Sequence, residues 1–140
     1  MEACRERVSR RPMGRVQDGL RILIVEDNKD SRETLRTLLE LLGHHVDVAE
    51  DGVEGIHKAL TCSPMIALVD VGLPLLDGYK VAQCLRTVLG RKIFLVAHTG
   101  YGQPEDRRRA FEAGFDAHLV KPVDWLELHS WLSELSNSRR

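Results

Sequence analysis

Residues 65–70 are Met65-Ile66-Ala67-Leu68-Val69-Asp70, an uninterrupted apolar run that ends in a carboxylate. Similar continuous runs occupy residues 22–25 and 93–97. Such runs are typical of central parallel strands, because helices cover both faces of these strands and no polar alternation is needed. The runs at residues 46–49 and 117–120 are shorter and more polar, so we expect them to be edge strands.

Segments of helical periodicity alternate with these runs. The leucines between Leu35 and Leu42 follow the spacing i, i+3, i+4, i+7, and Gly43 after them is a good C-terminal stop. The four other predicted helices are marked by Val53, Ile56 and Leu60; by Val81, Leu85, Val88 and Leu89; by residues 104–113; and by Trp125, Leu128, Leu132 and Leu135. This strict alternation predicts a three-layer α/β/α sandwich with a parallel sheet, whose functional site lies at the carboxyl ends of the strands.

The net charge of the chain does not indicate any particular class of partner. Its 140 residues include 20 Lys+Arg and 21 Asp+Glu, a balance that points neither to nucleic acid nor to an anionic membrane. Residues 1–19 hold five Arg against three acidic residues, which predicts a basic tail or linker before a domain at residues 20–136 and a short tail at 137–140. We expect a cytoplasmic protein, because no apolar run has a membrane-spanning length and no signal-peptide core follows the first arginines.

Polar side chains follow four of the five predicted strands. Glu26 and Asp27 come after the first strand, Asp70 after the third, Thr99 after the fourth and Lys121 after the fifth. A parallel sheet brings these groups to one edge, where three carboxylates repel one another and one lysine cannot neutralise them. An all-oxygen acidic cluster favours Mg²⁺, and the set of Mg²⁺, lysine and hydroxyl suits phosphoryl transfer to an aspartate nucleophile.

Four motifs in this order resemble the receiver domain of two-component response regulators, most closely the receivers attached to hybrid histidine kinases. They are residues 24–28 (Ile-Val-Glu-Asp-Asn), 70–79 (Asp-Val-Gly-Leu-Pro-Leu-Leu-Asp-Gly-Tyr), 99–102 (Thr-Gly-Tyr-Gly) and 114–122 (Gly-Phe-Asp-Ala-His-Leu-Val-Lys-Pro). The resemblance covers roughly residues 21–135. It implies a CheY-like, flavodoxin-like fold with strand order 2-1-3-4-5.

The resemblance also implies a role for each residue of the predicted site. Asp70 would be the phosphoacceptor, Thr99 would hydrogen-bond the phosphoryl oxygen, and Lys121 would pair with it. The implied Mg²⁺ ligands are Asp27 and Asp70 directly, Glu26 through a bound water, and the backbone carbonyl of Gly72. A cis peptide bond is implied before Pro122, the residue type for which a cis bond is cheapest.

Three positions depart from the family pattern or have no account within it. Glu26 stands where Asp is also common, and its extra methylene is expected to move the carboxylate outward. His118 replaces the Tyr or Phe that repacks on phosphorylation in many receivers, and we expect it to share the switch role with Thr99. His98 is a polar imidazole at the end of a buried strand, with no role implied.

The predicted function is a phosphorelay switch. A phosphohistidine on a sensor histidine kinase or a histidine phosphotransfer protein would donate to Asp70, and the surface of the fourth helix, fifth strand and fifth helix would then change its contacts with a downstream protein effector. We expect no direct nucleic-acid or membrane partner and no turnover enzyme. Two alternatives stay open: a binding-only pseudo-receiver, and a phosphatase with an Asp nucleophile. The phosphatase is disfavoured because Gly72 stands where its general acid is expected.

Overall fold

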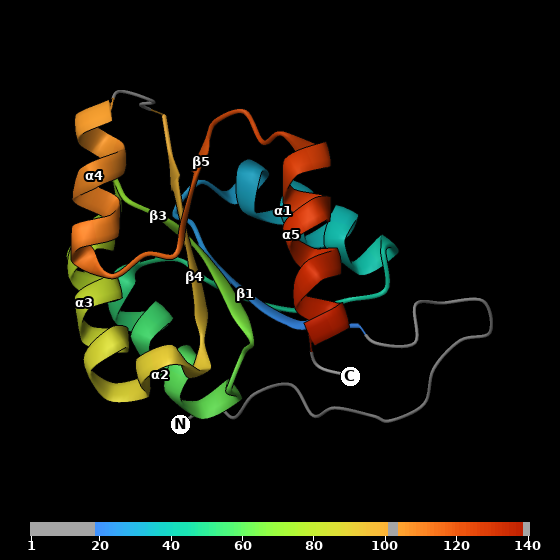
Figure 1. Cartoon of the computed structure of the whole chain (residues 1–140), viewed down its shortest axis with the longest axis horizontal. Coiled ribbons are helices and arrows are strands. Elements are labelled where there is room, and N and C mark those ends of the chain that lie inside the picture. Colours follow the sequence, from blue (N-terminus) through green and yellow to red (C-terminus); the bar gives the residue numbers. More distant parts are fainter. Residues whose placement is uncertain (1–18, 101–103, 139–140) are drawn as a thin grey trace.

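The structure, a computed structural model, describes residues 19–100 and 104–138. Strands and helices alternate along the chain in the predicted order (Figure 1). The elements are β1 (Arg21–Val25), α1 (Lys29–Leu41), β2 (His45–Ala49), α2 (Gly52–Cys62), β3 (Ile66–Asp70), α3 (Gly78–Leu89), the short 3-10 helix η1 (Gly90–Lys92), β4 (Phe94–Thr99), α4 (Pro104–Ala113), β5 (Ala117–Val120) and α5 (Trp125–Ser138). The predicted basic tail lies outside the described residues except for Gly19, and α5 includes two residues that were expected in the C-terminal tail.

The five strands form one parallel sheet in the order β2-β1-β3-β4-β5. This is the strand order that the resemblance implied, and the two shorter, more polar runs are the edge strands as predicted. Helices α1 and α5 cover one face of the sheet, and α2, α3 and α4 cover the other (Figure 1). The three-layer sandwich is therefore confirmed.

The apolar core is divided by the sheet into two clusters. Successive residues of β1 illustrate this, since Leu23 packs among the α2–α4 residues while Ile22 and Ile24 pack against α1 and α5. Because neighbouring side chains of a strand point to opposite faces, a strand covered on both sides must be apolar throughout. This requirement produces the continuous runs in the sequence.

Helix α2 does not bury the face that its apolar stripe predicts. Val53 and Leu60 are 58% and 45% exposed, whereas Gly55 and Ala59 are buried. A Cβ at Gly55 would lie 2.9 Å from both Cγ atoms of Val25, so the helix approaches β1 more closely than a larger residue allows. The stripe prediction was wrong for Val53 and Leu60, because close packing through small residues outweighed their hydrophobicity, whereas Ile56, the third residue of the stripe, packs against the core. Val88 of α3, also predicted to face the core, is 58% exposed.

None of the helices in the described ranges combines the length and apolarity needed to cross a bilayer.

Candidate functional site

The predicted site residues lie together at one edge of the sheet. Glu26 directly follows β1, Asp70 and Thr99 are the last residues of β3 and β4, and Lys121 directly follows β5. The parallel register sets Asp70 beside His98 on the neighbouring strand. The convergence that strand-end positions predict is therefore present.

Three carboxylates form the negative part of the site. Single oxygen atoms of Glu26, Asp27 and Asp70 all lie within 4.8 Å of one another. Glu26 and Asp70 are buried and Asp27 is exposed. Within the described part of the chain, the Oε1 atom of Glu26 is buried without a hydrogen-bond partner of good geometry. A buried carboxylate oxygen with unused acceptor capacity, in an acidic group made only of oxygen ligands, fits a hard divalent cation such as Mg²⁺.

Lys121 supplies one positive charge to this cluster. Its Nζ lies 3.4 Å from Glu26 Oε1 and 3.3 Å from Asp70 Oδ2. The other oxygen of Asp70, Oδ1, accepts a hydrogen bond of 3.0 Å from the Gly72 backbone N–H. Asp70 therefore has one oxygen bound to the loop that follows β3 and one directed at the lysine.

The electrostatics of Glu26 and Lys121 reflect the excess of acid. Burial raises the pKa of Glu26, the hydrogen bond from the Asn28 backbone opposes this, and the charge of Asp70 raises it further, so that the net shift is upward. Partial burial lowers the pKa of Lys121, but the charges of Asp70 and Glu26 outweigh it and leave that pKa raised. The lysine is held in its charged form while one carboxylate resists ionisation.

The carboxylate of Glu26 does not project outward as its length suggested. The residue is 2% exposed, and its Oε2 accepts a hydrogen bond of 3.1 Å from the Asn28 backbone N–H. Asn28 in turn caps α1, because its Oδ1 accepts a 2.8 Å bond from the Ser31 N–H. The longer side chain is thus turned back onto its own loop, and the outward expectation was wrong.

The remaining predicted positions are buried side chains on β4 and β5. Thr99 is 2% exposed, and His118 on β5 is 9% exposed with no hydrogen bond to Nε2 from the described residues. His98 is also buried; burial, and then the charge of Lys121, lower its pKa to about 4. It is a neutral imidazole at neutral pH. The peptide bond before Pro122 is cis, as the resemblance implied.

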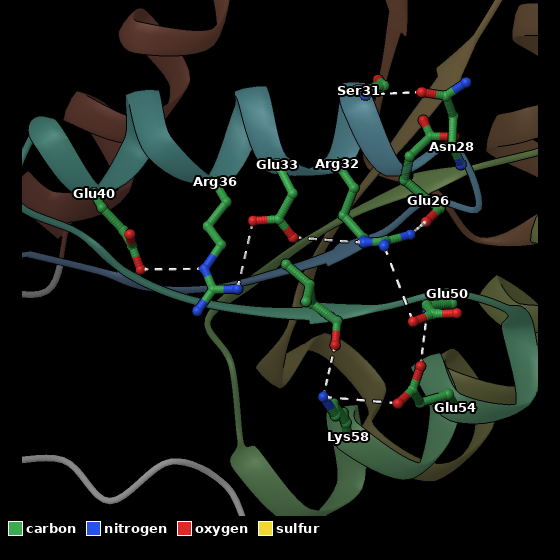
Figure 2. Close-up of polar contacts among 11 residues, drawn as sticks. Glu26, Asn28, Ser31, Arg32, Glu33, Arg36, Glu40, Glu50, Glu54 and Lys58 are labelled. Carbon is green, nitrogen blue, oxygen red and sulfur yellow. Dashed lines mark hydrogen bonds and ion pairs between the residues drawn. The ribbon is translucent and has the colours of Figure 1, made fainter.

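Sequence reasoning missed one buried charge beside the site, Arg32 on α1. It is 7% exposed, and its Nη1 donates a 3.0 Å hydrogen bond to the backbone carbonyl of Glu26 (Figure 2). A signal for it was available, because Arg32, Leu35 and Leu39 share the buried face of the helix at spacing i, i+3, i+7. A cation on an apolar stripe indicates a specific partner.

Comparison with known proteins agrees with this arrangement. The family model described as "Response regulator receiver domain" matches residues 22–133. The chain is 37% identical over 108 residues to an uncharacterized 14.6 kDa protein of Leptolyngbya boryana, covering 76% of this chain and 82% of that protein. It is also similar to the solved receiver domain of sensor histidine kinase PA1611 from Pseudomonas aeruginosa PAO1, with TM-score 0.77 and 31% identity, covering 85% of this chain and 98% of that one. That structure has a magnesium ion coordinated in its active site cleft.

Several curated relatives are much longer than the region they share with this chain. The gliding motility regulatory protein of Myxococcus xanthus is 39% identical over 103 residues, which are 73% of this chain and 13% of that protein. The transcriptional activator protein IrlR of Burkholderia pseudomallei is 40% identical over 110 residues, and the chain spans 47% of its length.

Proposed function

This chain belongs to the response regulator receiver domain family, and on that premise we propose that it accepts a phosphoryl group on Asp70 in a Mg²⁺-dependent reaction. The observation that carries the proposal is the charge of the site. Glu26, Asp27 and Asp70 converge within 4.8 Å, while Lys121 provides a single ammonium group. A dication would remove the imbalance. The magnesium ion in the cleft of the Pseudomonas receiver domain supports this choice of metal.

The residues that would hold Mg²⁺ are Asp27, Asp70 and the carbonyl of Gly72, with Glu26 acting through a bound water. When bound, Mg²⁺ supplies positive charge against the oxygens of the transferring phosphoryl group. The buried Oε1 of Glu26, which accepts no hydrogen bond from the described residues and lies 3.4 Å from Lys121 Nζ, is the feature of this chain that favours such an occupant.

The transfer itself uses Asp70 as nucleophile. A carboxylate oxygen of Asp70 forms a bond to phosphorus as the bond from phosphorus to the donor histidine nitrogen breaks, and the electron pair of that bond stays on the imidazole. Lys121, already 3.3 Å from Asp70 Oδ2, would pair with a phosphoryl oxygen, and the Thr99 hydroxyl would donate a hydrogen bond to another. Attack by water on phosphorus later releases phosphate and restores the carboxylate.

Receiver domains are signalling switches, and we propose that Thr99 and His118 carry the switch here. Both side chains are buried, on β4 and β5 respectively. Movement of Thr99 toward the phosphoryl group would let His118 repack and so change the surface formed by α4, β5 and α5. A downstream protein would read that surface.

The phosphodonor we propose is a phosphohistidine on a sensor histidine kinase or a histidine phosphotransfer protein. A groove beside Lys121 supports a macromolecular donor, because it is lined by residues of α1, of the segment after β5 and of the start of α5, among them Leu35, Pro122 and Trp125. A donor protein seated there would bring its histidine next to Lys121, which lies 3.3 Å from Asp70 Oδ2.

The test is incubation of the protein with phosphoramidate and Mg²⁺, followed by intact-mass and peptide mass spectrometry. We expect one phosphoryl adduct on Asp70, lost in Asp70→Asn and lost in the presence of EDTA. The matched control is Asp30→Asn, which neutralises an exposed aspartate on the first turn of α1 and should retain the adduct. Absence of the adduct in the folded wild type would overturn the proposal and leave a binding-only pseudo-receiver. Persistence of the adduct in Asp70→Asn would overturn it by showing that another residue is the acceptor.

A further inference from the structure

Helix α1 places a buried guanidinium directly behind the acidic loop of the site. Arg32 is 7% exposed and lies on the helix face that also buries Leu35 and Leu39. Its Nη1 donates a 3.0 Å hydrogen bond to the backbone carbonyl of Glu26 (Figure 2). This bond is made to the main chain, so Arg32 does not occupy the carboxylate oxygens of Glu26.

The other contacts of Arg32 do not explain why a charge is buried here. Its Nε lies 3.8 Å from Glu33 Oε2, and its Nη2 lies 3.9 Å from Glu50 Oε2. Both distances exceed hydrogen-bond range, and the Glu50 side chain is 71% exposed, so solvent screens the attraction. The Nε atom has no hydrogen-bond partner in the described residues. The one close contact of the guanidinium among those residues is therefore the Glu26 carbonyl.

That carbonyl belongs to the peptide that joins the two acids of the β1–α1 loop. On one side, the Glu26 N–H donates to the Ala49 carbonyl at 3.0 Å; on the other, the Asn28 N–H donates to Glu26 Oε2 at 3.1 Å. The bond from Arg32 adds a third fixed point between these two. A held carbonyl restricts rotation of the Glu26–Asp27 peptide, and with it the directions in which the two side chains leave the backbone.

We propose that Arg32 is a positioning residue for the metal site: it holds the Glu26–Asp27 peptide so that both carboxylates converge on Asp70. This inference rests on the proposed function, since it concerns the same site. Because the guanidinium contacts a carbonyl, it orients the acids without neutralising them. A lysine at this position has a single-point donor in place of the planar fork and would orient the peptide less well.

The experiment compares Arg32→Met, Arg32→Lys and the control Arg36→Met. Arg36 lies one turn further along α1, is 28% exposed, and pairs with Glu33 and Glu40 (Figure 2). Mg²⁺ affinity is measured by calorimetry, and ¹⁵N NMR spectra are recorded in EDTA. We expect Arg32→Met to weaken Mg²⁺ binding about tenfold, the usual effect of losing a group that orients ligands, Arg32→Lys to recover part of it, and Arg36→Met to change it less than about twofold.

The metal-free spectra separate positioning from a general loss of structure. In the Arg32 variants the amide shifts of Glu26, Asp27 and Asn28 should change while those of α3 and α4 stay as in the wild type. Unchanged Mg²⁺ affinity in Arg32→Met would overturn the inference; if that variant does not fold, unchanged affinity in a folded Arg32→Lys would overturn it. Failure of the wild type to bind Mg²⁺ would instead overturn the proposed function, and this inference with it.

Discussion

Two charged clusters lie at opposite ends of the sheet, and they differ in how fully their charges are paired. At the carboxyl end, three carboxylates face one lysine, which pairs with two of them, and Glu26 Oε1 accepts no hydrogen bond from the described residues. At the other end, directly before β5, the carboxylate of Asp116 accepts hydrogen bonds on both oxygens. The donors are Arg86 Nη2 at 2.7 Å, the Leu95 N–H at 2.8 Å and Arg91 Nη1 at 3.0 Å.

The comparison separates charge that stabilises the fold from charge that serves a function. Arg86 also donates to three backbone carbonyls, those of Gly90, Ile93 and Gly114. It therefore joins η1, the residue before β4 and the turn before β5, with most of its donors used. The acidic cluster has no such balance, and its repulsion reduces the stability of the metal-free protein. A complete set of partners indicates a structural cluster, whereas an excess of one charge indicates a site that needs a ligand.

The largest effect is expected from breaking the balanced cluster. Arg86→Met leaves Asp116 and three carbonyls without their main donor in a part-buried setting, and should lower the free energy of unfolding by about 3 kcal/mol. Urea denaturation measures this. Mg²⁺ affinity should change less than about twofold, because the cluster is at the far end of the sheet. A stability loss below about 1 kcal/mol would show that the cluster does not stabilise the fold.

A second prediction concerns His98, which lies beside the acidic cluster. Its pKa of about 4, below the ordinary 6.5, means that acid favours the unfolded state, so stability is complete above pH 6.5 and is lost as the pH falls toward 4. Between pH 7 and pH 5 the loss due to this group is about 2 kcal/mol. His98→Leu should remove that part of the acid sensitivity, as measured by urea denaturation at both pH values.

The matched control for His98→Leu is His57→Leu, the same substitution at an exposed histidine of α2. His44 and His118, whose pKa values burial also lowers, are present in both proteins and contribute equally. An identical pH dependence of unfolding for wild type and His98→Leu would contradict the prediction.

The positions of the site residues were predictable because they follow from topology. Asp70 and Thr99 end apolar runs, and a parallel sheet admits only one edge at which such ends can meet. The edge strands were predictable for a similar reason. An edge strand pairs with a neighbouring strand on one side only, so it can contain more polar residues than a central strand. In these cases the burial of a strand in the sheet is what requires the apolar run, so the run in the sequence reveals the position of the strand.

The features that were not predicted depend on contacts between elements. The buried face of α2 is set by Gly55 against Val25, and glycine adds nothing to an apolar stripe. The direction of Glu26 is set by a hydrogen bond from its own loop, and the partner of Arg32 is a main-chain carbonyl that no sequence pattern marks. Side-chain direction and buried polar pairing are decided at the tertiary level, after the elements are in place.

A third prediction reduces the excess charge of the functional cluster. Burial is the main reason that the pKa of Glu26 is raised in the folded protein. As the pH rises above 4.5, this carboxyl ionises in the unfolded chain before it does in the folded one. The metal-free protein therefore loses stability with rising pH. Glu26→Gln should therefore gain on the order of 1 kcal/mol at pH 7, and the gain should vanish near pH 4. Urea denaturation in EDTA at both pH values measures it.

The same substitution should weaken Mg²⁺ binding at least about tenfold, because one acid of the cluster is lost. Stability and metal affinity would then move in opposite directions. A Glu26→Gln variant that is less stable than the wild type at pH 7 would mean that the attraction to Lys121 outweighs burial and repulsion, and the contrast between the two clusters would fail.

The smallest effect is expected at Arg91, the outer partner of Asp116. Its side chain is 84% exposed although its Nη1 lies 3.0 Å from Asp116 Oδ1. Solvent screens such a pair, so Arg91→Met should cost about 0.5 kcal/mol or less, with the difference disappearing in about 1 M NaCl. A double-mutant cycle with Arg86→Met measures how far the two arginines act independently. A loss of unfolding free energy above about 1 kcal/mol that persists at high salt would contradict this prediction. It would show that Asp116 needs Arg91 in addition to Arg86 and the Leu95 N–H.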